Sequence, residues 1–142
     1  MERDTPPRLR GVLETAIYVA DLGRSTTWYR DLFGFEVLIE DDRMCAFDVG
    51  GRDVLLLFLK GGTLESVDTP GGRIPPHDAE GRIHFAFAAD VADIPVWERR
   101  LARAGVEVES RVEWKATAKS LYFRDPDGHL VELATPGLWA NY

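Results

Sequence analysis

After two polar positions, the hydrophobic pattern over residues 14–20 becomes a run rich in β-branched and aromatic residues, which predicts a strand. Asp21 follows as a candidate N-cap, and apolar residues at helical spacing predict a helix that runs to about Phe33. Gly34 is suited to end this helix, because glycine adopts the left-handed conformation without a steric penalty. Further strands are predicted over residues 35–40, 44–49 and 54–59.

The same order of elements returns in the second half of the chain. A strand over residues 82–89 precedes a helix over 94–104, and Gly105 ends that helix. Strands are then predicted over residues 106–111, 118–124 and 129–135. The sequence Asp-Pro-Asp-Gly over 125–128 is typical of a hairpin turn, and residues 61–81, rich in Gly and Pro, form a linking loop.

This repetition predicts an α+β fold of two βαβββ modules, whose sheets form a half-open barrel around a shared cavity. Neither half has enough core to stand alone comfortably, so residues 1–142 are interpreted as one domain. The first module spans about residues 12–60 and the second about 82–135, and an aromatic tail follows over 136–142.

The composition is that of a globular protein. Hydrophobic residues make up 45% and charged residues 29% of the 142 positions, and no apolar run approaches the roughly 20 residues of a membrane span. The net charge of −7 comes without a basic patch, so no nucleic-acid partner is expected. Cys45 is the single cysteine and no secretory signal is apparent, so we expect a cytoplasmic protein in which Cys45 is a small buried hydrophobe.

Three polar residues interrupt predicted strands, namely Glu14, His84 and Glu132. Glu132 lies between Val131 and Leu133, where a carboxylate is costly to bury unless it is paired or binds a metal ion. Carboxylates and imidazoles are ordinary ligands of divalent first-row metals. The residues alone leave two alternatives open: a strand Glu that faces solvent, and a strand His that is hydrogen-bonded in the core.

Several stretches of the chain are similar to a known family. They read Ile-Tyr-Val-Ala-Asp-Leu over 17–22, Trp-Tyr-Arg-Asp-Leu-Phe-Gly over 28–34 and Ile-His-Phe-Ala-Phe over 83–87. The strongest reads Ser-Leu-Tyr-Phe-Arg-Asp-Pro-Asp-Gly-His-Leu-Val-Glu-Leu over 120–133. On these motifs, nearly the whole chain resembles the vicinal oxygen chelate superfamily, which contains glyoxalase I, bleomycin-resistance and fosfomycin-resistance proteins, and extradiol dioxygenases.

The resemblance implies a divalent metal ion held by Glu14, His84 and Glu132, with Mn, Fe, Ni, Zn and Mg all open. It implies an enzyme that chelates a small oxygenated substrate on the metal and stabilises an oxyanion or enolate. Lyase or isomerase chemistry is expected first and ring-opening dioxygenation second. The alternative is a metal-free small-molecule binding protein of the bleomycin-resistance type.

Relatives of this kind often assemble from two chains. We therefore expect a homodimer in which Glu14 comes from one chain and His84 with Glu132 from the other.

Two departures from the family's pattern bear on the reaction. Glu14 stands where many relatives have His, so the dioxygenase set of two His and one carboxylate is restored only if His77 is a ligand. Glyoxalase I takes a further Glu from the last strand of its first half, whereas residues 54–57 here contain no carboxylate. This difference argues against lactoylglutathione lyase activity.

Four further residues are candidates for the site. Tyr122 and His77 are expected to transfer protons, and Ser120 and Trp114 to bind the substrate. The alternatives are that Tyr122 only fills the barrel and that His77 is a solvated loop residue. The aromatic tail over 136–142 either closes the pocket or packs on a partner, and the sequence does not choose between the two.

Overall fold

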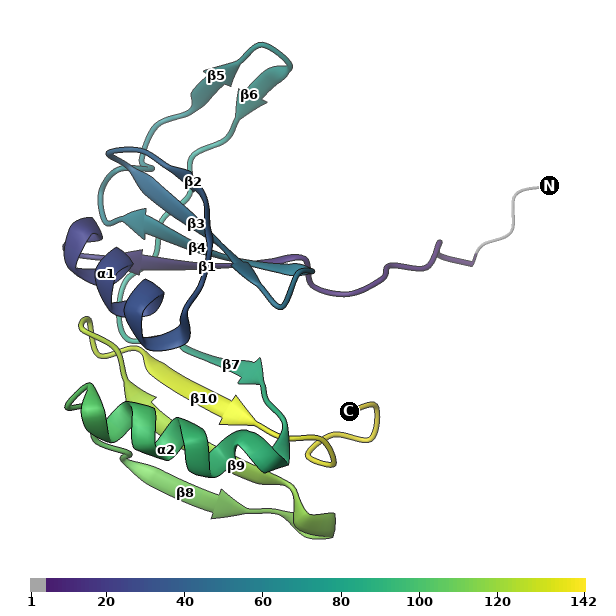
Figure 1. The fold of residues 1–142 in the computed structure, drawn as a ribbon. Coiled ribbons are helices and arrows are strands. Elements are labelled where there is room, and N and C mark those ends of the chain that lie inside the picture. The colour runs from purple at the N-terminus through teal and green to yellow at the C-terminus, as the bar shows by residue number, and fades with distance from the viewer. Residues whose placement is uncertain (1–4) are drawn as a thin grey trace.

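The computed structural model describes residues 5–142 and contains two βαβββ modules (Figure 1). The first consists of β1 (Glu14–Val19), α1 (Leu22–Phe33), β2 (Val37–Glu40), β3 (Met44–Val49) and β4 (Asp53–Leu59). The second consists of β7 (His84–Ala88), α2 (Ile94–Arg103), β8 (Ser110–Glu113), β9 (Lys119–Arg124) and β10 (Leu130–Ala134), with short 3-10 helices η1 (Val91–Asp93) and η2 (Lys115–Thr117). The predicted α+β class is confirmed.

Each module forms one four-stranded sheet, in the orders β1-β4-β3-β2 and β7-β10-β9-β8. In both sheets the first strand pairs in parallel with the last, and the other pairs are antiparallel. The register relates the modules to each other, because Glu14 pairs with Val54 as His84 pairs with Leu130. The strands β1 and β7 are therefore corresponding edge strands.

The ends of α1 follow from local sequence chemistry. The Asp21 carboxylate accepts a hydrogen bond from the Arg24 amide at 2.9 Å and thereby satisfies a donor of the first turn. Gly34 takes a φ of 71°, the left-handed conformation that ends a helix. The predicted start and stop of this helix are confirmed.

Other predicted boundaries differ from the structure. The linking loop carries a β-hairpin of β5 (Val67–Thr69) and β6 (Gly72–Ile74), which stands away from the two modules (Figure 1). The strand predicted over 106–111 is instead β8, which begins at Ser110, because Val106 and Val108 pack against the core of the second module. The strands predicted from 35 and 82 begin at Val37 and His84.

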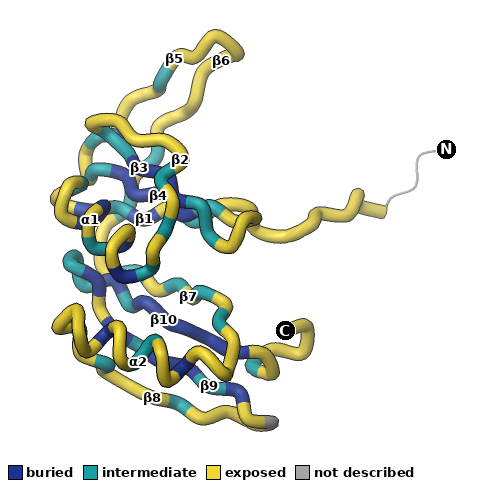
Figure 2. The backbone as a smooth tube through the Cα atoms, in the orientation of Figure 1, coloured by how far each residue is buried: buried dark blue, intermediate teal, exposed yellow. Residues whose placement is uncertain are grey.

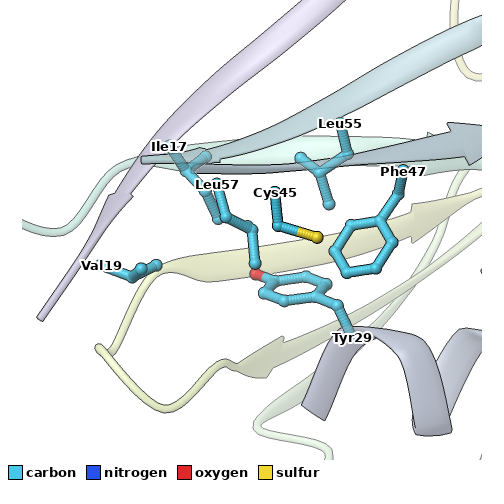
Figure 3. Close-up of a cluster of buried hydrophobic side chains, with 7 residues drawn as sticks. All are labelled: Ile17, Val19, Tyr29, Cys45, Phe47, Leu55 and Leu57. Carbon is cyan, nitrogen blue, oxygen red and sulfur yellow. The ribbon is translucent and has the colours of Figure 1, made fainter. Parts of the chain in front are cut away.

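The hydrophobic core lies between each sheet and its helix. Figure 3 shows Tyr29 of α1 among the apolar side chains of the first sheet. In the second module, Ile94 and Leu101 of α2 belong to one cluster with Phe123 and Val131 of the sheet. The edge strand β7 alternates exposed and half-buried positions, whereas β10 is almost wholly buried (Figure 2). Each helix thus covers one face of its sheet, and the opposite face is free to form a site.

Hydrogen bonds from the 125–129 segment fix the two modules against each other. The Tyr29 hydroxyl donates to the Asp125 carboxylate at 2.6 Å, and the Ala20 amide donates to Asp127 at 2.8 Å. The buried His129 ring accepts from the Ile83 amide through Nδ1 and donates to the Tyr18 carbonyl through Nε2. The predicted hairpin turn is therefore also the main polar link between the modules.

Within residues 5–142, no helix combines the length and the apolar character that crossing a membrane requires.

Candidate metal centre on the open face of the second sheet

The open face of the second sheet, opposite α2, carries His84, Ala86, Tyr122 and Glu132. The register places Glu132 of β10 between Ala86 of β7 and Tyr122 of β9. A cavity of about 660 Å³ lies over this face, and the aromatic side chains of Trp114, Trp139 and Tyr142 contribute to its walls. The size is that of an ordinary small-molecule site.

His84 and Glu132 converge at this cavity. His84 Nε2 lies 3.2 Å from Glu132 Oε1, and the Glu132 side chain is only 6% exposed. On the other side of the ring, His84 Nδ1 lies 3.0 Å from the Leu130 carbonyl oxygen. A carbonyl oxygen only accepts, so Nδ1 carries a proton and donates it in this hydrogen bond.

This arrangement leaves two acceptors facing each other. In the neutral imidazole Nε2 has only a lone pair, and the ionised Glu132 carboxylate has no proton to offer. Either a proton shared by the pair or a metal ion must therefore lie between them. The 3.2 Å separation suits two ligands of one ion with bonds of about 2.0–2.2 Å. A backbone carbonyl on Nδ1 is the usual support of a metal-binding histidine.

The second oxygen of Glu132 is held by Ser120. The Ser120 hydroxyl donates to Glu132 Oε2 at 2.5 Å and accepts from the Trp114 indole N–H at 2.9 Å. Ser120 is 1% exposed, so in a single chain its hydroxyl serves Glu132 instead of facing the cavity. Trp114 is 41% exposed and lines the cavity, and its expected contact with a substrate stays a prediction.

Tyr122 faces the same cavity beside His84. The centroids of the two rings lie 6.1 Å apart. Burial, and then the negative charge of Glu132, raise the pKa of the Tyr122 phenol above its ordinary value. The hydroxyl is thus held in its protonated, hydrogen-bond-donating form.

Glu14 lies elsewhere in the single chain. It is exposed at the start of β1, on the face of the first sheet that α1 does not cover. Within residues 5–142, no cluster of three or more His, Cys, Asp or Glu side chains is placed to hold a metal ion. The structure therefore brings together His84 and Glu132 but does not add Glu14 to them.

His77 lies in the linking loop and packs on the first sheet. Its ring packs edge-on against Phe58, with centroids 4.7 Å apart, and Nδ1 is hydrogen-bonded to the Tyr18 hydroxyl. Burial, and then Asp78, raise the pKa of Tyr18 above its ordinary value, so the Tyr18 hydroxyl keeps its proton. Sequence reasoning missed Tyr18, although strand alternation places it on the same face as Glu14.

The aromatic tail over 136–142, whose role the sequence did not decide, lies over the second sheet. The Tyr142 hydroxyl donates to the Ala134 carbonyl at 2.7 Å, and Leu138, Trp139 and Tyr142 line the cavity. Of the two alternatives, the single chain therefore shows the tail as a wall of the pocket.

Comparison with known proteins adds a family and named relatives. A family model described as the glyoxalase/bleomycin resistance protein/dioxygenase superfamily matches residues 11–133. A metallothiol transferase, FosB from Bacillus licheniformis, is 32% identical over 90% of this chain and 77% of its own. A glutathione transferase, FosA from Serratia marcescens, is 28% identical over 94% of this chain and 86% of its own.

Among solved structures, a lactoylglutathione lyase from Agrobacterium tumefaciens has the same fold. It superimposes with a TM-score of 0.82 and 35% identity, and the match covers 96% of this chain and 99% of that one. The family and these named relatives fit the divalent metal cofactor that the sequence predicts.

Proposed function

Because this chain belongs to the glyoxalase/bleomycin resistance protein/dioxygenase superfamily, we propose that it is a metal-dependent enzyme acting on an oxygenated small molecule. His84 and Glu132 hold the divalent ion on the open face of the second sheet. The observation that carries this proposal is the pair of facing acceptors, His84 Nε2 and Glu132 Oε1, at the floor of a cavity. When bound, the ion supplies Lewis acidity toward a substrate oxygen.

A second copy of the chain supplies Glu14. Two ligands from one module leave the ion incompletely held, and Glu14 is exposed on the corresponding edge strand of the other module. The edges of β1 and β7 are both unpaired within residues 5–142, and exposed edges favour association. A two-fold dimer that apposes module one of each copy to module two of the other completes two identical sites.

Among reaction classes, we favour transfer of a thiol to an electrophilic carbon of the substrate. The printed names of two relatives and of one solved structure, two transferases and a lyase, all refer to a thiol or to glutathione. In such a transfer the thiolate forms a bond to carbon, a carbon–oxygen bond breaks, and the oxygen takes up the electron pair and then a proton. Tyr122 is placed to give that proton, since its hydroxyl stays protonated at the cavity wall.

Lyase or isomerase chemistry is the second candidate. It needs a base that moves a proton between neighbouring carbons, which in glyoxalase I is a Glu on the last strand of the first half. Here the register puts Leu56 at the position that corresponds to Glu132, because Ala16 pairs with Leu56 as Ala86 pairs with Glu132. A lyase route must therefore use another base, and His77 beside Tyr18 is the available candidate.

Ring-opening dioxygenation depends on His77 as a second imidazole ligand. In the single chain His77 packs against Phe58 of the first sheet, so this route also requires a second copy to bring the two faces together. The metal-free binding protein remains the alternative from another class. The aromatic walls of the cavity favour a binding protein, but a binding protein does not require His84 and Glu132 to converge.

The test is metal content followed by activity. We expect the purified protein to bind one Mn²⁺, Co²⁺ or Zn²⁺ per chain in calorimetric titrations and to run as a dimer of twice 15.9 kDa in light scattering. The metal-loaded protein is then assayed with glutathione, cysteine and other low-molecular-weight thiols against fosfomycin and related epoxides, and with methylglyoxal for the lyase alternative. Absence of divalent metal binding contradicts the enzyme and favours the binding protein.

A further inference from the structure

A continuous row of hydrogen bonds leads from the rim of the cavity to the metal-binding pair. It begins at the Trp114 indole N–H, passes through the Ser120 hydroxyl and reaches Glu132 Oε2, with distances of 2.9 and 2.5 Å. The other carboxylate oxygen, Oε1, faces His84. The two oxygens of Glu132 therefore have different partners. Oε2 is bound by the row of hydrogen bonds that starts at Trp114, and Oε1 faces His84.

We propose that Trp114 is a positioning residue that acts through Ser120 to hold Oε1 of Glu132 toward the metal. This inference rests on the proposed metal site. The indole donates only, so it fixes the direction of the Ser120 hydroxyl, whose own proton must then point to Oε2. Such rows strengthen each member by mutual polarisation, which matters most at a buried carboxylate like that of Glu132.

The backbone around Trp114 is held in an unusual conformation. Thr117 has a φ of 70°, in the left-handed region that a β-branched residue rarely adopts. The Trp114 amide donates to the Ala118 carbonyl at 2.7 Å, which closes the loop that contains Thr117. Strained residues persist where their surroundings over-determine them, and they gather at functional sites. The strained loop thus lies directly beside the residue whose indole donates to Ser120.

Trp114 also lines the cavity and is 41% exposed, so its indole face is accessible to a molecule bound there. One side chain therefore connects the substrate space with the orientation of a metal ligand. A residue that only filled space would have no need of the hydrogen bond to Ser120.

The experiment measures Co²⁺ and Mn²⁺ affinity of the full-length wild type, Trp114→Phe, Ser120→Ala and the double variant. Ser120→Ala is expected to weaken metal binding about 10- to 100-fold, as loss of a ligand's supporting partner does. Trp114→Phe is expected to weaken it about 2- to 13-fold, the value of one hydrogen bond. Because Trp114 acts through Ser120, the double variant should bind within about twofold of Ser120→Ala.

The matched control is Trp139→Phe, which changes a 68% exposed indole of the same cavity that makes no hydrogen bond to another side chain within residues 5–142. It should leave the metal affinity unchanged. The absorption spectrum of bound Co²⁺ should shift in Trp114→Phe but not in Trp139→Phe, because only the former alters the ligand geometry. Thermal unfolding of the metal-free variants confirms that each is folded.

Three results overturn the proposal. The first is that Trp114→Phe binds metal as tightly as the wild type; the second is that the loss of affinity in the double variant equals the product of the two single losses; the third is that Trp139→Phe loses as much affinity as Trp114→Phe. If Trp114→Phe does not fold, Ser120→Ala is the test. Unchanged metal affinity in Ser120→Ala also refutes the proposal that the row of hydrogen bonds orients Glu132. If the wild type itself binds no Co²⁺ or Mn²⁺, the metal site fails and this inference fails with it. If the wild type binds and Trp114→Phe binds equally well, only the role of Trp114 fails.

Discussion

A mixing experiment tests whether the site is built from two chains. If Glu14 comes from one copy and His84 with Glu132 from the other, Glu14→Ala and His84→Ala each destroy both sites of a homodimer. In a heterodimer of the two variants, both substitutions fall in the same site. The other site is then intact, so metal binding reappears on mixing two proteins that each lack it.

The expected magnitude follows from this geometry. After random exchange of subunits about half of the dimers are heterodimers, and each has one intact site of two, so about a quarter of the wild-type metal capacity should return. The exposed position of Glu14, away from the His84–Glu132 pair, is what makes recovery possible. If one chain held all three ligands, every chain in the mixture would lack one and no capacity would return.

The assay is a Co²⁺ titration followed by absorbance, after the variants are co-expressed or unfolded and refolded together. The matched control mixes His84→Ala with Glu132→Ala. These two residues lie 3.2 Å apart in one module, so no arrangement of two chains restores a complete site. No recovery in the Glu14/His84 mixture, or equal recovery in the control mixture, refutes the shared site.

The remaining predictions concern the metal and the fold. His84→Ala should abolish Mn²⁺ uptake in calorimetry while the far-UV circular dichroism stays that of the wild type, because this side chain is half exposed; retained uptake contradicts its role as ligand. Tyr29→Phe removes a buried bond to the Asp125 carboxylate and should lower the free energy of unfolding in urea by about 1.5–3 kcal/mol at pH 7. Burial, and then Asp125, raise the pKa of Tyr29 well above 10.0, so the stabilisation by the Tyr29 hydroxyl is complete below pH 10 and is lost as the pH rises further. The difference in free energy of unfolding between wild type and Tyr29→Phe should therefore decrease in urea titrations above pH 10. A difference that stays constant with pH contradicts the raised pKa. Leu101→Ala empties a fully buried position between α2 and its sheet and should cost about 2–5 kcal/mol in the same assay, a loss that a near-neutral result would refute.

The repeated modules could be predicted because their determinants are local. The β-branched and aromatic residues of β1, the Asp21 cap and the left-handed Gly34 are properties of neighbouring residues, and they act in the same way in any tertiary context. The strand predicted over 106–111 was misplaced because Val106 and Val108 have strand-like character but pack on the core of the second module. The hairpin in the linking loop was missed, because Gly and Pro mark turns without showing whether strands flank them.

For the site, the sequence indicated which residues interrupt apolar strands, and the strand register determines which of them lie close together. Parallel pairing of β7 with β10 brings His84 to Glu132 across 48 positions of the chain. Only the tertiary structure decided that Ser120 and Trp114 hold one oxygen of Glu132, since hydrogen bonds between strands depend on register and rotamers. The resemblance already implied that Glu14 reaches the pair from another chain, and within one chain the structure keeps Glu14 away from the pair. The placement of one module against the other is set by contacts between distant segments, such as Tyr29 with Asp125, that no local pattern encodes.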